Sequence, residues 1–218
     1  MPEDNGCAHS GKDPRREFFD RHAANWDKGD PKWGEMFARF EEISELLELA
    51  RGENVLDVGC GTGDSTGWLG EKVHPGAVTG IDFSEKMLAR ARAKNIPAEF
   101  RVSDVCNDNL GEGLYDVIFC FQCFPHFRDR VAALGNFARA MKAGGRLIIL
   151  HLAGSSAINR HHGNAGGVVA GDYLPEAGEW DKLLAGAGLR KTRLIDRDNL
   201  YFLKAVGEKH LAPGSNID

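Results

Sequence analysis

The ten residues 54–63, read as Asn-Val-Leu-Asp-Val-Gly-Cys-Gly-Thr-Gly, constrain the fold of this chain more than any other segment. Residues 55–58 are apolar or β-branched except for Asp57, as expected of a strand that is buried on both faces. Three glycines follow at alternate positions and let the backbone turn sharply and approach a ligand, because they carry no Cβ: Gly59, Gly61 and Gly63. Asp64 or Ser65 can cap a following helix. This order predicts a pocket for a nucleotide-like ligand at the carboxyl end of the strand.

Two ligands commonly occupy such a pocket, a dinucleotide and S-adenosylmethionine, and the residues distinguish between them. The dinucleotide fingerprint is Gly-x-Gly-x-x-Gly, which leaves free backbone N–H groups at a helix N-terminus for the pyrophosphate. Counted from Gly59, the third glycine of that pattern falls on Asp64, whose carboxylate would repel a pyrophosphate. S-adenosylmethionine carries an ammonium and a sulfonium group, so a carboxylate beside it is electrostatically favourable.

A second carboxylate follows the next predicted strand. Residues 78–82 read Val-Thr-Gly-Ile-Asp, a short apolar strand that ends in Asp82, 19 residues after Gly63. A carboxylate in that place can accept hydrogen bonds from both ribose hydroxyls of a nucleotide. The alternative is that Asp82 only caps the following helix, although Ser84 can cap that helix itself.

The sequence of residues 54–63 resembles motif I of the class I S-adenosylmethionine-dependent methyltransferases. Residues 141–147, Met-Lys-Ala-Gly-Gly-Arg-Leu, match a second motif of that family, with Ala143 where proline is commoner. Residues 17–27 resemble the cap helix of its ubiquinone- and menaquinone-biosynthesis-type members, although amphipathic packing alone would explain them as well. The resemblance implies a set of contacts to S-adenosyl-L-methionine: Trp26, Asp57, Gly59, Cys60, Gly61, Gly63, Asp82, Phe83, Met87, Asp104, Val105, Cys120 and Phe121.

Within that set, the resemblance assigns different parts of the cofactor to different residues. It implies that Asp57 lies near the methionine end of the cofactor. Asp104 would bind the adenine amino group, and the N–H of Val105 would bind the ring. Cys120 and Phe121 would lie beside the methionine part. The pair Cys120 and Cys123 also has the spacing of a redox or zinc site, but without a second pair these cysteines are expected to be small apolar fillers.

Strands and helices alternate along the rest of the chain, which predicts parallel strands joined by right-handed helical crossovers. A helix is expected over 34–50, and a last helix over 175–187 with Pro175 in its first turn. Residues 143–145 are expected to end the helix over 128–141. The strands at 189–196 and 199–206 are so close in sequence that they must pair antiparallel. The expected fold class is α/β, doubly wound, with a mainly parallel seven-stranded sheet and an antiparallel C-terminal hairpin.

Length and charge limit the domain organisation and the partners. The 218 residues fit a single domain over 15–207 with an N-terminal helical cap at 15–50, between a disordered 1–14 and a tail at 208–218. The net charge of −5 argues against nucleic acid as a partner. Apolar runs are too short for a membrane span, the N-terminus lacks a signal-peptide core, and the five cysteines suit a reducing compartment. A cytoplasmic location is therefore expected.

Four histidines are the candidate catalytic residues: His126, His151, His161 and His162. The resemblance places His126 where many small-molecule methyltransferases carry a histidine that faces the transferred methyl group, and its imidazole can accept a proton. The alternative is a half-buried histidine that caps the helix at Arg128. Residues 151–174 are expected to form a long mobile lid over the acceptor, or else a solvated loop.

The same four histidines could also hold a divalent metal. The metal-dependent O-methyltransferases, however, draw their ligands largely from carboxylates, and this chain shows no such cluster in its sequence. The sequence therefore favours an enzyme without a metal site.

These features predict an enzyme that transfers a methyl group from S-adenosylmethionine to a small-molecule acceptor by in-line displacement. Two alternatives remain open: a non-catalytic module that binds the cofactor, and, less favoured, a nicotinamide-dependent oxidoreductase. Residue patterns do not distinguish a phenol, a quinone precursor, an amine or a thiol as the acceptor.

Overall fold

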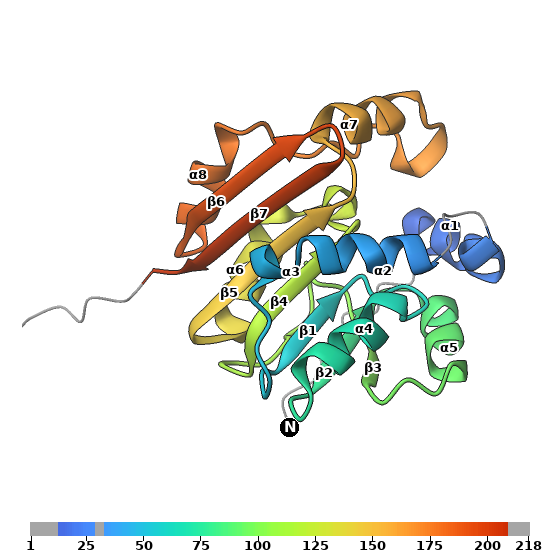
Figure 1. Ribbon diagram of the computed structural model, residues 1–218. Helices are drawn as coiled ribbons and strands as arrows, with labels where there is room; N and C mark the ends of the chain where they lie inside the picture. Colours follow the sequence, from blue (N-terminus) through green and yellow to red (C-terminus); the bar gives the residue numbers. More distant parts are fainter. Residues whose placement is uncertain (1–12, 29–32, 209–218) are drawn as a thin grey trace, which may run out of the picture.

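The structure, a computed structural model, describes residues 13–28 and 33–208. These residues contain a seven-stranded sheet in the order β3-β2-β1-β4-β5-β7-β6 (Figure 1). The first five strands are parallel, whereas β7 pairs antiparallel with both β5 and β6. This confirms the predicted fold class. The strands are β1 (Val55–Val58), β2 (Val78–Asp82), β3 (Glu99–Val102), β4 (Tyr115–Phe121), β5 (Met141–His151), β6 (Leu189–Arg197) and β7 (Leu200–Gly207).

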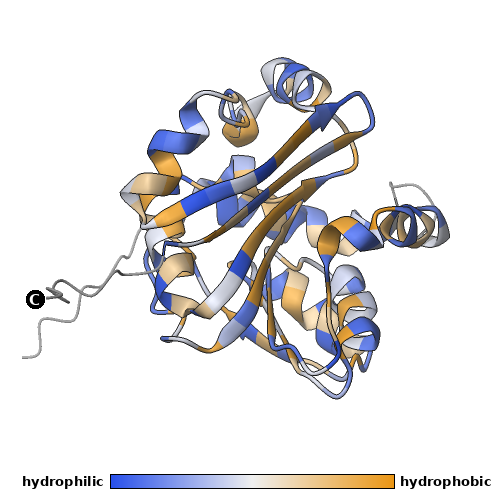
Figure 2. Ribbon diagram, turned by 60° about the vertical axis from the view of Figure 1, so that its left-hand side comes forward, coloured by the Kyte–Doolittle hydropathy of each residue, from blue (hydrophilic) through white to orange (hydrophobic). Residues whose placement is uncertain are grey.

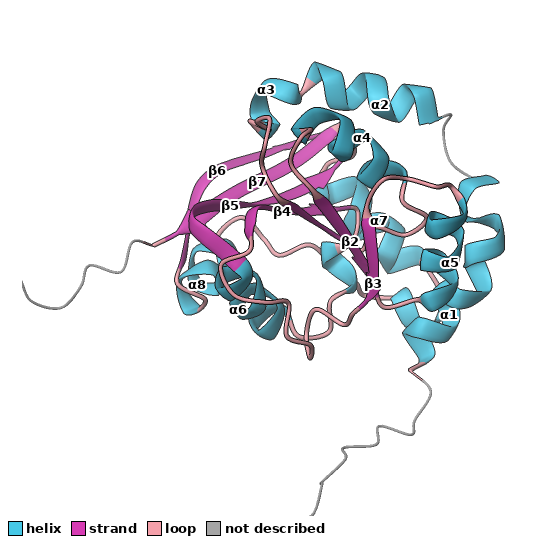
Figure 3. Cartoon of the chain, turned by 90° about the horizontal axis from the view of Figure 1, so that it is seen from below, coloured by secondary structure: helices cyan, strands magenta, loops and turns pink. Residues whose placement is uncertain are grey.

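Helices cover both faces of the sheet and bury its apolar central strands. Three helices lie on one face, α2 (Trp33–Glu42), α3 (Ser44–Leu47) and α4 (Asp64–Val73), and α6 (Arg130–Ala140) and α8 (Glu179–Gly186) lie on the other (Figure 3). Figure 2 shows that hydrophobic residues run along the central strands, whereas the helices carry both hydrophobic and hydrophilic residues. Each face has its own core, one around Phe40 and Trp68 and the other around Phe137 and Trp180. None of the helices described is long and apolar enough to cross a membrane.

Three predicted helix ends differ from the structure. The helix expected over 34–50 stops at Glu42, and the separate α3 ends where Glu48 adopts a left-handed φ of 50°. Arg146 donates hydrogen bonds to the carbonyls of Leu47 and Glu48, which satisfies the end of α3. Residues 143–145 do not end a helix, because β5 already starts at Met141 and residues 142–145 lie outside its regular pairing with β4. The last helix starts at Glu179 instead of Pro175.

The segment 151–174, expected to be a long loop, contains a regular helix. It includes α7 (Ser155–Asn164) and a short 3-10 helix, η3 (Gly167–Val169). The start of α7 is held by Asp196, which accepts hydrogen bonds from the N–H and the hydroxyl of Ser155. The Asn159 amide oxygen accepts a 2.8 Å hydrogen bond from the N–H of Leu174 and ties the helix to the chain that follows it. The structure therefore contradicts the expectation of a long loop over residues 151–174, because this segment contains a helix that is held by hydrogen bonds.

The N-terminal helices and α7 lie at the edge of the sheet where the parallel strands end (Figure 1). The N-terminal part consists of α1 (Pro14–His22) followed by a 3-10 helix, η1 (Ala23–Lys28). It packs against α5 (Glu85–Ala93) and against η3. Most of the predicted disordered segment 1–14 and of the predicted tail 208–218 lies outside the described residues, although Pro14 already belongs to α1.

Candidate active site

A cavity of about 2170 Å³ lies at the carboxyl ends of the parallel strands. Its wall is formed by the loops after β1, β2, β3 and β4, by the end of β5, and by α1, α2 and α7. Most of the residues predicted to bind the cofactor line it: Trp26, Gly59, Cys60, Gly61, Asp82, Phe83, Met87, Asp104, Val105 and Phe121. Asp57, Gly63 and Cys120 lie behind the wall. All four candidate histidines line the same cavity: His126, His151, His161 and His162.

The loop after β1 requires glycine at its first position for two reasons. Gly59 has a φ of 63°, and a Cβ added to it would lie 2.6 Å from the Cβ of Cys123. Gly61 also has a positive φ, and Trp26 of η1 lies over it, so that a Cβ added to Gly61 would be 3.6 Å from the indole Nε1. Gly63 forms the N-cap of α4, where no side chain donates or accepts a capping hydrogen bond, so the expected capping by Asp64 or Ser65 is wrong. The glycines therefore let this loop pack closely against Cys123 and Trp26.

Gly59→Ala is expected to destabilise the protein by about 2 kcal/mol, because the new methyl group overlaps Cys123 and the residue prefers a negative φ. Gly70→Ala is a matched control in the neighbouring helix α4, where a Cβ meets nothing within 4 Å. That control should be neutral or stabilising by up to about 1 kcal/mol. Urea denaturation of both variants tests this, and equal stability of the two would contradict the steric role of Gly59.

Asp57 is completely buried beneath the glycine loop. The hydroxyls of Ser65 and Thr66 donate to its Oδ2 at 2.9 and 2.6 Å, whereas its Oδ1 is a buried acceptor with no partner. Burial raises the pKa of Asp57 to about 7, and the nearby Asp82 acts in the same direction. Ser65 lines the cavity, so Asp57 is one hydrogen bond away from a ligand there.

Asp82 ends β2 and reaches the cavity with most of its carboxylate buried. The N–H of Gly61 donates to its Oδ2 at 3.1 Å, and the N–H of Ser84 donates to its Oδ1 at 2.8 Å. Burial raises the pKa of Asp82 to about 6. Helix α5 is capped by the Ser84 hydroxyl, which accepts from the N–H of Met87, so Asp82 is not the cap. Because a carboxylate has about four lone-pair positions, both oxygens can still accept a ligand hydroxyl.

The raised pKa values predict that ligand-free stability falls as pH rises. An unfolded aspartate titrates near pH 3.9, so a carboxyl with a raised pKa stabilises the folded state most at low pH. That contribution is lost as pH rises through the folded pKa, which is about 7 for Asp57. Between about pH 5 and pH 8 the loss is roughly 2 kcal/mol. Thermal or urea denaturation should show a flatter pH dependence for Asp57→Asn, and an unchanged pH dependence would contradict this assignment.

Three side-chain pairs hold α1 and η1, which form the first part of the helical cap, against the glycine loop and α5. Asp27 accepts from the Thr62 hydroxyl at 2.5 Å and from Arg90 at 2.8 Å. Asp20 accepts from the Ser84 hydroxyl at 2.5 Å. Aromatic contact adds to these bonds, because the ring of Phe19 packs on Trp26 and on Phe83. The N-terminal segment therefore covers the part of the cavity that the glycine loop and Asp82 form.

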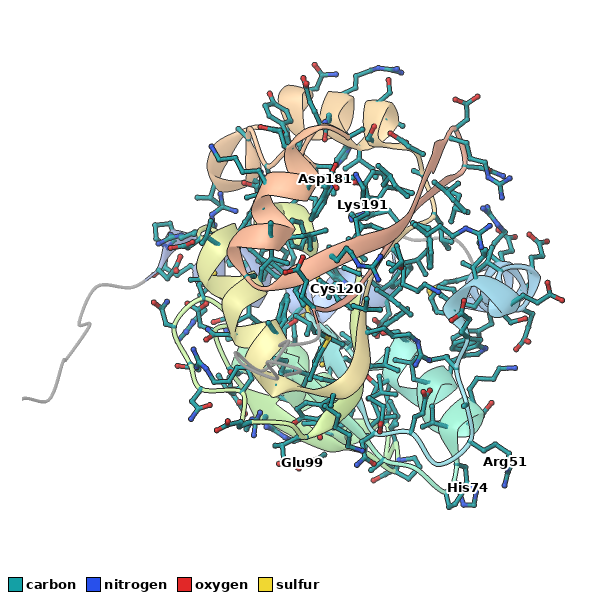
Figure 4. All side chains as sticks on the ribbon, turned by 90° about the vertical axis from the view of Figure 1, so that its left-hand side faces the viewer. Arg51, His74, Glu99, Cys120, Asp181 and Lys191 are labelled. Carbon is teal, nitrogen blue, oxygen red and sulfur yellow. The ribbon has the colours of Figure 1, made fainter. Side chains whose placement is uncertain are left out.

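Asp104, which is expected on the adenine side of the cofactor, has hydrogen-bond partners within the protein. Cys120 and Cys123 lie in the core. Asp104 accepts from the N–H of Cys106 at 2.9 Å and from the amide of Asn107 at 2.7 Å. Cys120 is buried inside the molecule (Figure 4). The Cys123 thiol donates to the carbonyl of Val58 at 3.1 Å, and burial raises its pKa. Both cysteines are free thiols in the apolar core, as expected of small fillers.

His126 is held by a carboxylate and an arginine that the sequence did not indicate. Its Nδ1 lies 2.7 Å from Oδ2 of Asp172, and both oxygens of Asp172 bind the Arg15 guanidinium at 2.5 Å. Burial opposes the ionisation of Asp172, but the hydrogen bonds from His126 and Arg15 outweigh it and lower the pKa of this carboxyl. Because the ionised carboxylate only accepts, the neutral form of His126 carries its proton on Nδ1 and a lone pair on Nε2. Helix α6 is capped by Asp129, so the alternative role of His126 as a helix cap is wrong.

The other three histidines differ in burial. His162 of α7 is buried, its ring centroid lies 5.0 Å from that of His126, and its Nδ1 lies 3.3 Å from the carbonyl of Val169. His151, the last residue of β5, is buried, and its Nε2 has no hydrogen-bond partner. Burial, with His126 and His162 nearby, lowers the pKa of His151 to about 3, so it is neutral. His161 is exposed at the cavity rim.

Comparison with known proteins shows similarity to methyltransferases. Residues 55–145 match the family model described as a methyltransferase domain. A demethylmenaquinone methyltransferase of Thermotoga maritima is 34% identical over 143 residues, which are 62% of this chain and 60% of that protein. Phosphoethanolamine N-methyltransferase 1 of Triticum aestivum is 30% identical over 171 residues, which are 76% of this chain and 34% of that protein. The chain thus spans less than two thirds of the length of these curated relatives.

The fold has matches among solved structures as well. Magnesium protoporphyrin IX methyltransferase from Synechocystis, solved with bound S-adenosylhomocysteine, has a TM-score of 0.65 at 21% identity. That match covers 88% of this chain and 98% of the other. The matched domain and the shared seven-stranded fold make this chain similar to S-adenosylmethionine-dependent methyltransferases.

Proposed function

We propose that this protein transfers the methyl group of S-adenosylmethionine to a small-molecule acceptor bound in the same cavity. The proposal rests on one observation, that two different sets of polar groups line the same cavity. One end has the glycine loop and the buried carboxylate of Asp82, and the other has the oriented imidazole of His126. Donor and acceptor can therefore meet in one cavity.

The residues at the first end fit the cofactor. Asp82 keeps free lone pairs on both oxygens for the ribose hydroxyls. Asp57 is buried beneath the loop, and its ionised form would attract a ligand with an ammonium and a sulfonium group. Gly59 and Gly61 line the cavity where the backbone-like methionine part would lie, and Asp104 and Val105 line the place for the adenine. When bound, the cofactor supplies an activated methyl group on a good leaving group.

The residues at the second end fit a small acceptor with a protonated nucleophilic atom. Apolar side chains, among them Met36 of α2 and Ile158 of α7, line the cavity together with the histidine imidazoles. The main contribution of these side chains would be to hold the nucleophile in line with the methyl group, since alignment supplies much of the rate enhancement in such reactions. In this proposal Nε2 of His126, the ring nitrogen that does not bind Asp172, accepts the proton of the nucleophile.

Several observations support a small acceptor over a nucleic acid. The chain has a net charge of −5, and two of its relatives are named for small acceptors, demethylmenaquinone and phosphoethanolamine. Free thiols at Cys60, Cys106, Cys120 and Cys123 fit a reducing compartment such as the cytoplasm. A non-catalytic cofactor-binding module would not require an imidazole oriented by a buried carboxylate.

Calorimetry followed by a transfer assay tests the proposal. S-adenosylmethionine and S-adenosylhomocysteine should bind with one site per chain, and NADH should not bind. Binding of NADH alone would replace the proposal with the oxidoreductase alternative. Incubation with donor labelled at the methyl group and a metabolite extract should then label a small molecule, which identifies the acceptor. Cofactor binding without any labelled product would favour the non-catalytic module.

A further inference from the structure

We propose that His126, His151 and His162 bind a divalent transition metal ion at the acceptor end of the cavity. This inference rests on the proposed function, because the ion would bind the nucleophilic atom of the methyl acceptor. It replaces the role of His126 as proton acceptor, since Nε2 of His126 would bind the ion instead. The three imidazoles come from three separate elements, η2 (Phe124–His126), β5 and α7, and they line one cavity. Imidazole nitrogen is a preferred ligand of zinc and of the neighbouring divalent metals.

The hydrogen bonds of His126 and His162 leave the right nitrogen free on each ring. Asp172 lies 2.7 Å from Nδ1 of His126, and the carbonyl of Val169 lies 3.3 Å from Nδ1 of His162. Both partners are acceptors, so each Nδ1 carries the proton and each Nε2 keeps a lone pair. Metal-binding histidines commonly donate their second ring N–H to a carboxylate or a backbone carbonyl in this way. Two of the proposed ligands are thus held in the tautomer that binds a metal.

His151 supplies the third nitrogen. Its Nε2 is buried and has no hydrogen-bond partner, which is unusual for a polar atom in a protein interior. The end of β5 fixes its position, because His151 pairs in register with Tyr201 of β7. A buried imidazole nitrogen without a partner, in a cavity that holds two other free imidazole nitrogens, is explained by an ion that all three share.

The spacing of the rings suits a common ion. Ligand atoms of His126, His162 and Asp172 lie within 4.8 Å of one another, and His151 is not part of that group. The ring centroids of His126 and His162 are 5.0 Å apart. Two imidazoles that bind one tetrahedral ion at about 2.0–2.1 Å place their centroids roughly 5 Å apart. Small rotations of these two rings would therefore bring their nitrogens to one ion, and His151 would have to approach that ion to supply the third nitrogen.

Asp172 orients His126 and is not itself a ligand in this proposal. Both of its oxygens already bind the guanidinium of Arg15, so its charge is neutralised on that side. Three protein ligands leave one position of a tetrahedral ion open, as in catalytic zinc sites. A hydroxyl or thiol that binds there has a lowered pKa and releases its proton to water. The methyl group then moves from sulfur to that atom, and S-adenosylhomocysteine and the methylated acceptor leave.

Titration of the chelator-treated protein with Co²⁺ tests the site, with visible absorption as the readout. We expect one ion per chain, and Zn²⁺ should displace it. Asp172→Asn should weaken binding about 10- to 100-fold, and loss of a direct ligand in His162→Ala should weaken it at least as much. His161→Ala is the matched control one residue away on the same helix, and His74→Ala is a remote control at the opposite end of the molecule (Figure 4). Neither control should change the affinity.

His162 is buried, so His162→Gln and His126→Gln are added to separate ligand loss from misfolding, which circular dichroism monitors. Binding that is not stoichiometric, or that survives in folded ligand variants, would overturn the site, as would equal loss in His161→Ala. Calorimetry with S-adenosylhomocysteine on the same preparations separates the two proposals. Retained cofactor binding without a cobalt site overturns the metal site alone. A cobalt site in a chain that binds no cofactor supports the metal site and overturns the proposed function.

Discussion

Asp82→Ala is expected to weaken the binding of S-adenosylmethionine by about 3 kcal/mol, which is on the order of 100-fold. The carboxylate is buried at the end of β2, and each of its oxygens holds one backbone N–H and keeps a lone pair toward the cavity. Two ribose hydroxyls would lose their charged acceptor in the variant. The N–H groups of Gly61 and Ser84 would also lose theirs, so the loop that faces the cofactor would be less fixed. Isothermal titration calorimetry measures the effect.

Two variants serve as controls for Asp82→Ala. Asp82→Asn keeps one acceptor oxygen and should lose less affinity. Glu85→Ala removes an exposed carboxylate three residues later, which pairs with Arg92 on the outer side of α5, and should leave the affinity unchanged. Unchanged affinity in Asp82→Ala, together with reduced thermal stability, would mean that Asp82 only supports the loop and does not bind the ribose.

The part of the site around the glycine loop could be predicted because its determinants are local in sequence. The residues 54–63 contain the strand, the turn and the start of the helix, and the alternation of elements fixes parallel neighbours for the strand. In a parallel sheet, carboxyl ends meet at one edge, so Asp82 had to lie beside Gly61, where the structure places it. Local pattern and topology were sufficient there.

The other end of the cavity could not be predicted, because its contacts join residues far apart in sequence. Arg15 and Asp172 are separated by 157 positions, and Asp172 and His126 by 46. Neither Arg15 nor Asp172 has a local pattern that distinguishes it from an ordinary surface charge. Helix α7 was missed for a similar reason, because Asp196 of the distant strand β6 holds its start and the N-cap is a glycine without a capping side chain.

The error at the end of the helix expected over 34–50 has a physical cause. Arg146 of β5 satisfies the last carbonyls of α3, so a helix that its apolar spacing would extend to residue 50 stops earlier. Four apolar residues that keep helical spacing in this segment, Met36, Phe40, Ile43 and Leu47, are buried, whereas the fifth, Ala50, is exposed. Periodicity therefore indicated which face is buried, whereas tertiary hydrogen bonds decided where the helix ends.

Asp172→Asn is expected to destabilise the protein by about 3 kcal/mol, at the lower end of the range for breaking a buried ion pair. Asp172 is 5% exposed and binds Arg15 of the cap and His126 of the cavity, so the variant leaves a partly buried guanidinium without its counter-charge. Asp181→Asn is the matched control, because Asp181 pairs with Lys191 on the surface (Figure 4) and is 71% exposed. That control should change stability by less than about 1 kcal/mol.

The ion pair between Arg15 and Asp172 also makes the destabilisation by Asp172→Asn depend on pH and on Arg15. The pKa of Asp172 is lowered in the folded state, so its stabilisation is present above the unfolded value near pH 3.9 and is lost as pH falls. The difference in unfolding free energy between wild type and Asp172→Asn should therefore shrink in acid.

In a double-mutant cycle with Arg15→Gln, the two losses of stability should be strongly non-additive, by about 1–3 kcal/mol, because both variants remove the same pair. Because Arg15 belongs to α1, hydrogen exchange in the cap should also accelerate in Asp172→Asn. Additive losses with an unchanged cap would mean that Asp172 acts through His126 alone and does not connect the cap to the acceptor end of the cavity.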